Sequence, residues 1–193
     1  MELQTAINSR RAYRSLLPIE IDQETIETLC KAAQLAPSCF NNQPWRFVFV
    51  KERDKLEELF TALSKGNHWA TKSSMIIAVF SEKSLDCLIK EREYYLLGTG
   101  MAVAYLLLKA TELGLVAHPI AGYDVDKAKE ILKIPAKMNL ITLIIVGKHN
   151  PEIDPELSEK QQKTEKKRPE RDPLSRFVFI DEYKPSEEYG EKD

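Results

Sequence analysis

The chain has 193 residues, which is room for one domain with an appendage rather than for two full domains. Hydrophobic residues at 43% and charged residues at 30% exclude a wholly disordered, a collagen-like or a disulfide-scaffold chain. The 28 Lys and Arg residues against 30 Asp and Glu give a net charge of −2. We therefore expect no general affinity for nucleic acid or for an anionic membrane.

The three cysteines, Cys30, Cys39 and Cys87, are an odd number without CxxC spacing. This count predicts neither a disulfide framework nor a thiolate metal site, and it favours a reducing compartment. The N-terminal MELQTAINSRR lacks the apolar core of a secretory signal, and the most apolar stretch, 101–108, is too short to cross a bilayer. The sequence thus predicts a cytoplasmic protein.

The first half of the chain alternates helical and strand patterns. Asp22 is a candidate N-cap for a helix with one apolar face, and Pro37 closes that helix. The run WRFVFV at 45–50 has strand composition, and 56–63 carries apolar residues along one face of a second helix. The run MIIAVF at 75–80 predicts a buried strand.

The middle of the chain holds the longest predicted helix, over 91–113. It becomes almost wholly apolar through MAVAYLLL, and a helix that is apolar on all sides must be enclosed. A strand over 115–121, a helix begun by Asp124 and a strand over 140–146 follow. Helices and strands are therefore mixed along the whole chain.

The C-terminal part begins with a charged stretch, 149–173, which lacks apolar periodicity and should run over a surface. It leads to RFVFI at 176–180, which reads as a strand. An apolar strand at the end of a polar arm can pair with a sheet edge of another subunit, or fold back on its own sheet. The sequence leaves both arrangements open.

Three guanidinium groups lie within five residues near the N-terminus, at Arg10, Arg11 and Arg14. Arginine suits a bidentate grip on a phosphate dianion, so this segment is a candidate phosphate clamp. A solvated basic turn would have the same composition, and the motif alone does not decide between the two.

The segment APSCFNNQPW at 36–45 connects a predicted helix to a predicted strand. Its amide side chains both donate and accept hydrogen bonds, which a heteroaromatic ring with alternating N and C=O groups requires. A turn-rich connection without any ligand remains an equal interpretation.

Together these segments resemble the flavin-dependent nitroreductase family. The resemblance consists of RRxxR near the N-terminus, A-P-S-x-x-N-x-Q-P-W at 36–45, the central helix, the P-I-A-G-Y turn at 119–123 and the closing basic motif RPERDPL at 168–174. It implies an α+β fold in three layers, with a mainly antiparallel central sheet flanked by helices. It also implies a homodimer in which the C-terminal strand is exchanged. The implied organisation is an FMN-binding domain over 1–174 and a strand and tail over 175–193 that completes the partner's sheet.

The resemblance also implies which residues bind FMN. The N-terminal arginines and the closing motif would hold the phosphate, the 37–41 segment would reach the flavin from the partner subunit, and 119–122 would lie beside the ring near N5. The implied cofactor-binding residues are Arg10, Arg11, Ala12, Arg14, Pro37, Ser38, Cys39, Asn41, Asn67, Pro119, Ile120, Ala121, Gly122, Arg168 and Arg171. No catalytic side chain and no metal site are implied, because flavin N5 carries the chemistry.

Three positions depart from the family's pattern. Position 12 is Ala where many members have Ser, and position 121 is Ala where several members have Glu. Position 39 is Cys, whose soft side chain would lie near the flavin. The implied fold and cofactor survive these departures, but an assignment of the substrate does not.

The implied activity is transfer of a hydride from NADH or NADPH through FMN to a small acceptor, a nitroaromatic, a quinone or a free flavin, by a ping-pong mechanism. Two rivals are a flavin-binding sensor or carrier without turnover and a nucleic-acid-binding protein that uses its basic turns. Flavin fragmentation and reductive dehalogenation are further chemistries of the family. We expect the partners to be a second copy of the chain and the acceptor, without nucleic acid or membrane.

Other motifs favour structural roles. The sequence Gly98-Thr99-Gly100 imitates a dinucleotide fingerprint but follows a helical pattern, so close helix packing is favoured. The small residues of this helix would let two copies, one from each subunit, approach closely; they are Gly98, Gly100, Ala102 and Ala104. The histidines lack metal-ligand spacing and are expected to be core or solvated residues. Cys30 and Cys87 are expected to be packing residues.

Overall fold

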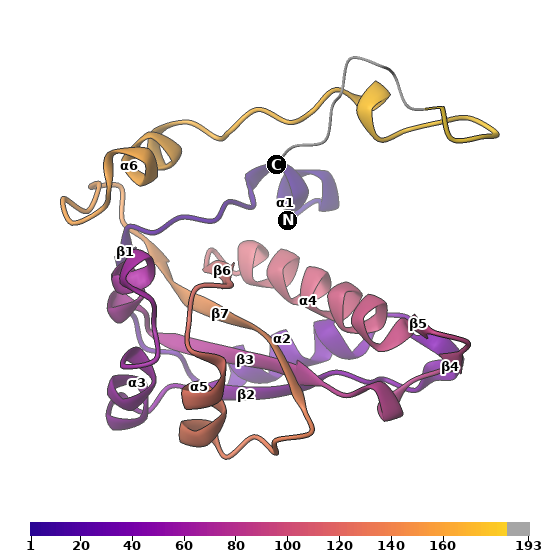
Figure 1. Cartoon of the computed structure of the whole chain (residues 1–193). Helices are drawn as coiled ribbons and strands as arrows, with labels where there is room; N and C mark the ends of the chain where they lie inside the picture. The colour runs from indigo at the N-terminus through magenta and orange to yellow at the C-terminus, as the bar shows by residue number, and fades with distance from the viewer. Residues whose placement is uncertain (185–193) are drawn as a thin grey trace.

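The computed structural model describes residues 1–184 (Figure 1). The α-helices are α1 (Leu3–Ser9), α2 (Gln23–Gln34), α3 (Arg53–Phe60), α4 (Tyr94–Glu112), α5 (Val125–Leu132) and α6 (Glu159–Lys166). The strands are β1 (Leu16–Leu17), β2 (Arg46–Val50), β3 (Met75–Ser81), β4 (Leu88–Ile89), β5 (Arg92–Glu93), β6 (Val116–Ile120) and β7 (Asn139–His149). Short 3-10 turns include η1 (Cys39–Asn41), η2 (Lys65–Lys72) and η4 (Leu174–Arg176).

The main sheet is antiparallel throughout. Its order is β1-β7-β3-β2, and β6 also pairs with β7. The long strand β7 is its centre, because β3 and β6 pair with overlapping parts of β7, and so with its two opposite edges, and β1 pairs with its C-terminal end. The two short strands β4 and β5 form a separate hairpin. The expected antiparallel sheet is thus confirmed.

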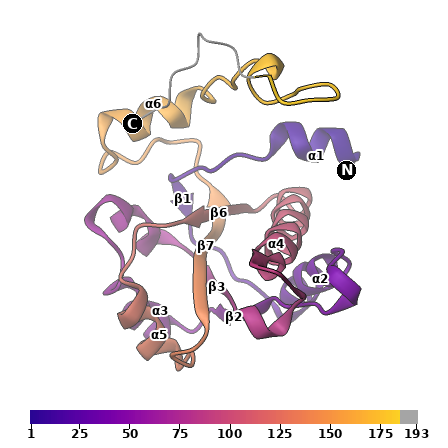
Figure 2. The same cartoon turned by 45° about the vertical axis from the view of Figure 1, so that its right-hand side comes forward.

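Helices cover both faces of this sheet, with α2 and α4 on one side and α3 and α5 on the other (Figures 1 and 2). Alternate residues of β3 therefore enter two separate cores: Ile76 and Ala78 pack with α3, whereas Met75, Ile77 and Val79 pack with α2 and α4. Burial on both faces explains why this strand is a continuous apolar run rather than an alternating one. The three-layer α+β architecture is confirmed.

Two predicted helix starts are confirmed by their caps. The carboxylate of Asp22 accepts a hydrogen bond from Thr25 N at 2.7 Å, and that of Asp124 accepts one from Lys127 N at 3.0 Å. Each side chain satisfies a backbone donor that has no partner within the helix. The apolar face of α2 packs into the core, where Leu29 and Ala33 are buried against α4 and the sheet.

The central helix α4 is enclosed on one side only in the single chain. Ala102, Leu106 and Ala110 are fully buried against the sheet, but Leu97 is 58% exposed and Tyr105 is 43% exposed. One chain alone therefore does not enclose this helix completely, and enclosure by a second chain stays a prediction. The small residues divide in the same way: Gly98 and Ala102 face the chain's own core, and Gly100 and Ala104 are exposed.

The polar stretch at 149–173 contains a helix that the periodicity did not predict. Ser158 opens α6 through a capping box, in which its hydroxyl accepts from Gln161 N and the Gln161 side chain accepts from Ser158 N. Glu165, near the end of α6, is buried. This helix is held by its cap and by one buried polar residue, so it has no apolar stripe to reveal it.

The predicted strand at 176–180 is not formed in this single chain. The segment turns through η4 and continues without pairing, and Phe177, Val178 and Ile180 are exposed. Figure 1 shows it running across the top of the molecule, away from the sheet. A strand needs a partner edge for its backbone groups, and residues 176–180 meet none in one chain. Exchange with a second chain stays a prediction, and residues 185–193 of the predicted tail lie outside the described residues.

Within residues 1–184, no helix is both long enough and apolar enough to span a membrane. The division into a domain over 1–174 and a tail over 175–193 stays a prediction.

Candidate functional site

Three arginines from the two ends of the described chain come together above the sheet. Arg168, which follows α6, donates from Nη2 to the carbonyl oxygens of Arg10 and Asn8, both at 2.6 Å. The Arg10 guanidinium lies close enough to Arg168 and Arg171 for electrostatic repulsion from both. The structure thus joins the N-terminal RRxxR segment to the closing basic motif.

This cluster of Arg10, Arg168 and Arg171 is not neutralised within residues 1–184, where none of the three forms an ion pair. Partial burial lowers the pKa of Arg10, and the like charges of Arg168 and Arg171 lower it further. A guanidinium stays protonated under all ordinary conditions, so the lowered pKa expresses unfavourable electrostatics rather than titration. An anion bound here would relieve that repulsion.

Arg14 and Arg11 reach α6 from the same segment. The backbone N–H of Arg14 donates to Glu165 Oε1 at 2.8 Å, and its Nη1 donates to Thr164 Oγ1 at 3.2 Å. Burial lowers the pKa of Arg14, while the Glu165 carboxylate opposes that shift. Arg11 donates to the carbonyl oxygens of Thr164 and Glu165 and lies 4.5 Å above the ring of Tyr13. Arg11 is therefore already engaged by protein groups, whereas Ala12 beside it is exposed.

His118 lies under this cluster, on β6. It is only 7% exposed, and its ring stacks on Trp69 with the centroids 4.8 Å apart. Burial lowers the pKa of His118 to about 4, with Arg14 and Arg10 adding to the effect and the bond to Tyr13 opposing it. Since a carbonyl only accepts, the contact of Nδ1 with Tyr13 O at 3.0 Å requires the proton on Nδ1. The imidazole is thus neutral, with Nε2 left as an acceptor.

The β6 turn and Asn67 meet next to His118 and Trp69. Asn67 Nδ2 donates to Gly122 O at 2.9 Å, and Asn67 Oδ1 accepts from Trp69 Nε1 at 3.3 Å. A Cβ atom on Gly122 would lie 2.5 Å from Ser64 Oγ and 2.6 Å from Asn67 Nδ2, closer than real contacts allow. Only glycine permits this approach of the two segments.

The rest of the 119–122 turn continues from β6. Pro119 is half-buried and Ala121 exposed, whereas Ile120 is buried and its carbonyl accepts from Thr142 Oγ1 at 2.9 Å. Tyr123 then anchors the turn, since Leu63 and Tyr123 form an isolated bridge. Burial raises the pKa of the Tyr123 phenol to about 12. The turn is therefore fixed at both ends and presents Ala121 outward.

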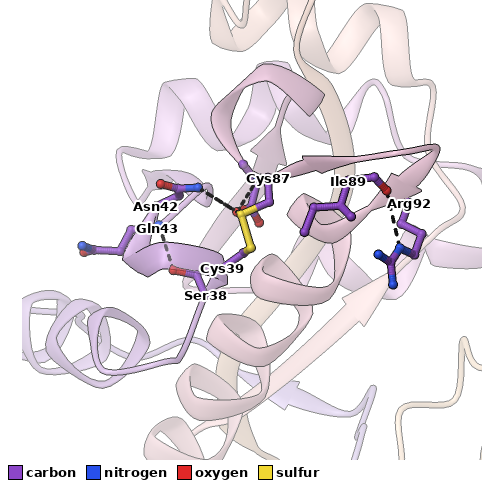
Figure 3. The surroundings of a disulfide bond; sticks show 8 residues. Ser38, Cys39, Asn42, Gln43, Cys87, Ile89 and Arg92 are labelled. Atoms are coloured by element: carbon purple, nitrogen blue, oxygen red, sulfur yellow. Dashed lines mark hydrogen bonds between the residues drawn. A yellow bond between two sulfur atoms is a disulfide. The ribbon is translucent and has the colours of Figure 1, made fainter.

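The 37–41 segment lies elsewhere in the chain, beside the N-terminal half of α4. Cys39 is bonded to Cys87 (Figure 3). Pro44 Cγ lies 3.3 Å from the position that a Cβ on Gly98 would take. Ser38 Oγ accepts from Gln43 N at 2.9 Å, and Pro37 and Asn41 are exposed. Within one chain, the structure does not bring this segment to the arginine cluster.

The disulfide Cys39–Cys87 corrects two expectations drawn from the cysteine count. The two residues are 48 positions apart, with a Cα–Cα distance of 6.0 Å. The count did not predict this bond, because folding of two distant loops creates the pair. Cys87 is not a packing residue, and only Cys30 remains a free cysteine. The cysteine argument for a reducing compartment loses its basis, and a cytoplasmic location stays a prediction.

The sequence patterns do not identify two residues of the site, His118 and Glu165. His118 lacks metal-ligand spacing, and the one local signal for it is its position directly before the 119–123 motif. Glu165 lies in a stretch interpreted as surface, and no local pattern distinguishes it from the neighbouring charges. The carboxylate of Glu165 accepts from Arg14 N and Ser15 N, which only the tertiary fold reveals.

Comparisons with known proteins agree with this fold. The model of the nitroreductase family matches residues 7–148. A solved structure described as an oxidoreductase containing FMN is 26% identical, with a TM-score of 0.82, and the match covers 94% of this chain and 92% of that one. A nitroreductase family protein from Clostridium novyi NT has a TM-score of 0.73 at 24% identity, over 78% of this chain and 87% of that one.

An Archaeoglobus fulgidus protein, provisionally named NADH dehydrogenase/NAD(P)H nitroreductase, is 28% identical over 154 residues. The match covers 77% of this chain and 86% of that protein. The similarity therefore extends over most of both chains rather than over one motif.

Proposed function

Because the chain belongs to the nitroreductase family, we propose that it is an FMN-dependent oxidoreductase that passes two electrons from NADH or NADPH to a small acceptor. The observation that carries the proposal is the cluster of Arg10, Arg168 and Arg171, which has no anionic partner within residues 1–184. The solved structure described as containing FMN supports the choice of cofactor.

The arginine cluster fits the phosphate end of FMN. The guanidinium groups of Arg10 and Arg171 form no ion pair in the described part of the chain. A phosphate dianion would supply the negative charge that they lack. Arg168 uses Nη2 to fix Arg10 and Asn8, so it would contribute charge and position together. Binding of a dianion beside these three guanidinium groups is favourable, because its negative charge offsets the repulsion among the like charges.

The other N-terminal residues would have different roles. Arg14 contacts Thr164 on α6 and, like Arg10, lies near His118, so it would add a further charge to the phosphate site. Arg11 would have to leave the carbonyl oxygens of Thr164 and Glu165 to reach a phosphate, so we assign it to holding α6. Ala12 is exposed and offers only its backbone, in keeping with the absence of a hydroxyl there.

The turn at 119–122 and Asn67 would receive the ring. Ala121 is exposed at the end of β6, and the bond from Asn67 to Gly122 O fixes the backbone beside it. Pro119 and Ala121 would supply small apolar surface rather than charge, and the buried Ile120 would shape the turn from beneath. A flat ring that is neutral over most of its area needs such a surface, with a few backbone groups to orient it.

We further propose a homodimer, in which Pro37, Ser38, Cys39 and Asn41 of one chain complete the other chain's site. The exposed side of α4, with Leu97 and Tyr105, supports a partner that covers it. The exposed Phe177, Val178 and Ile180 likewise suit pairing of the tail with a second chain. The strand exchange expected from the sequence is part of this proposal.

Bound FMN would supply the redox chemistry itself, accepting a hydride from the nicotinamide and delivering electrons to a nitroaromatic, a quinone or a free flavin in a ping-pong sequence. The chain would bind and orient the reactants and exclude water. No acid or base is needed beside the ring, in keeping with a neutral, buried His118.

The visible spectrum of the purified full-length protein tests the proposal first, followed by titration of flavin-free protein with FMN. Stopped-flow mixing with NADH or NADPH should then bleach the bound flavin, and a panel of nitroaromatic, quinone and flavin acceptors should restore its colour. A protein that neither carries nor binds FMN would refute the cofactor assignment. Bound FMN that neither coenzyme bleaches would instead favour a flavin carrier.

A further inference from the structure

The Cys39–Cys87 bond joins two loops outside both hydrophobic cores. Cys39 begins η1, the turn between α2 and β2, and Cys87 directly precedes the exposed hairpin of β4 and β5. Neither cysteine belongs to either core, and both are half-buried (Figure 3). A reagent can therefore reach this bond without unfolding the protein.

We propose that Cys39–Cys87 is a reversible thiol–disulfide exchange site for a dithiol reductant, and that its opening releases the turn at residues 40–43. The proposal goes beyond the oxidoreductase activity, since it assigns a second redox-active group to the chain. The reacting group is the S–S bond and not the flavin, although Cys39 also belongs to the segment that would complete the partner's FMN site.

The turn that the disulfide holds has an unusual backbone. Phe40, Asn41 and Gln43 have φ angles of 47°, 59° and 49°, in the left-handed region that favours glycine. A bulky residue such as Phe40 reaches this region only where its surroundings impose it. Phe40 is 89% exposed, so packing of its side chain does not impose it.

Local bonds and the disulfide together hold this turn. Asn41 N donates to Ser38 O at 3.1 Å, Asn42 N to Cys39 O at 3.0 Å and Gln43 N to Ser38 Oγ at 2.9 Å. Across the bridge, Asn42 Nδ2 donates to Asp86 Oδ1 at 3.3 Å and lies 3.5 Å from Cys87 Sγ. Opening the bridge removes the one covalent constraint among these contacts.

The segments on either side of the turn are anchored independently. Pro44 O accepts from Ser81 Oγ at 2.8 Å, and Ala36 and Trp45 are buried in the core with α2. These contacts do not depend on the disulfide. Release should therefore stop at residues 37 and 43 and leave the sheet intact.

The exchange is a balanced two-electron reaction. A thiolate of the dithiol attacks one sulfur of the Cys39–Cys87 bond, and the other cysteine leaves as a thiolate that takes up a proton. The second thiol of the reagent, once deprotonated, attacks the reagent's own sulfur in the mixed disulfide and releases the cysteine that was held there as a thiolate, which also takes up a proton. The dithiol is oxidised to its own disulfide, and the protein gains two thiols; the reverse reaction with that disulfide restores the bond.

The opening has a consequence that rests on the proposed function. If residues 37–41 complete the partner's FMN site, release of the turn would weaken FMN binding to the dimer. The cofactor site would then be tighter in the oxidised protein than in the reduced one.

The test treats the native full-length protein with dithiothreitol and traps free thiols with iodoacetamide for mass spectrometry. We expect one alkylated cysteine before treatment, Cys30, and three afterwards. Hydrogen exchange measured on the same samples should show roughly tenfold faster exchange of the amides of Asn41, Asn42 and Gln43 after reduction, because their bonds within the turn open. Exchange in β3 should not change.

Two variants serve as controls. The double variant Cys39→Ser, Cys87→Ser should show the fast exchange without dithiothreitol and no response to it. Cys30→Ser should behave as the original protein, with no alkylated cysteine before reduction and two afterwards.

A bond that dithiothreitol opens only in denaturant would overturn the proposal, and so would reduction that leaves exchange at 41–43 unchanged. FMN titration of both redox forms separates the two proposals. Equal affinity of the two forms would reject the coupling to the cofactor site, whereas no FMN binding by either form would reject the proposed function and leave the exchange result standing.

Discussion

Arg168 holds Arg10 in place although both side chains are cationic: Nη2 of Arg168 donates to the Arg10 carbonyl oxygen at 2.6 Å. The bond joins the closing motif to the end of α1 across 158 residues of sequence. It also keeps the Arg10 guanidinium within the field of Arg168 and Arg171. The fold thus keeps like charges close together, as the proposed phosphate site requires.

Replacing Arg171 or Arg10 by alanine should weaken FMN binding by roughly 10- to 100-fold, because each change removes a charge-assisted contact to the phosphate. Titration of flavin-free protein measures this effect. Without FMN, Arg171→Ala should leave the free energy of unfolding unchanged or slightly raised, because it removes like-charge repulsion.

Arg53→Ala is the matched control for these variants, because Arg53 lies on α3 and pairs with Glu57. It should leave FMN affinity unchanged. Unchanged affinity in both Arg10→Ala and Arg171→Ala would remove the phosphate assignment.

His118 should make the protein sensitive to mild acid. Its pKa is about 4 when folded and 6.5 when unfolded, so between these values the unfolded chain binds a proton that the folded chain does not. Above pH 6.5, His118 therefore does not change the free energy of unfolding. As the pH drops from 6.5 towards 4, this free energy falls by about 3 kcal/mol in total.

Urea unfolding from pH 7 to pH 4 measures this loss. The loss should be smaller in His118→Gln, while a variant of the exposed His68, His68→Gln, should follow the original protein. Equal pH dependence in all three proteins would contradict the buried, neutral state of His118.

Glu165→Ala should lower the free energy of unfolding by about 3 kcal/mol, because the backbone N–H groups of Arg14 and Ser15 lose a charged acceptor in a buried place. Glu130→Ala, at an exposed position on α5, should change stability by no more than about 0.5 kcal/mol. Equal effects of the two substitutions would mean that Glu165 does not hold α6 against the N-terminal segment.

Gly122→Ala should cost about 1 to 2 kcal/mol, since its Cβ would displace Asn67 Nδ2 and Ser64 Oγ and break the bond to Gly122 O. Thermal unfolding measures this cost. Gly66→Ala is the matched control, because a Cβ there meets open space. Equal unfolding temperatures of the two variants would mean that Gly122 does not pack closely against Asn67 and Ser64.

Leu97→Glu tests the homodimer. Leu97 is 58% exposed in one chain, so the substitution should barely affect folding of that chain but should dissociate a dimer that buries this side of α4. Light scattering at several concentrations measures the oligomeric state. Val125→Glu, on the opposite layer, should leave the oligomeric state unchanged. A Leu97→Glu protein that remains dimeric would show that the exposed side of α4 is not the dimer interface.

The sequence alone determined most of the layered fold, because the signals involved are local. Asp22 and Asp124 mark helix starts through hydrogen bonds three residues away, and the uninterrupted apolar run of β3 reflects burial on both faces. The order of the motifs between residues 10 and 171 was likewise sufficient to indicate the family and to nominate Arg10, Arg168 and Arg171.

Only the tertiary structure decided which of these residues meet. The bond between Cys39 and Cys87, the burial of Glu165 beneath Arg14 and the neutral state of His118 each depend on segments that are distant in sequence. Conversely, RFVFI at 176–180 has strand composition but forms no strand in one chain, because a strand requires an edge to pair with. Local sequence patterns determine secondary-structure propensity and helix caps. The pairing of charges, cysteines and strands depends instead on which distant segments the fold brings together.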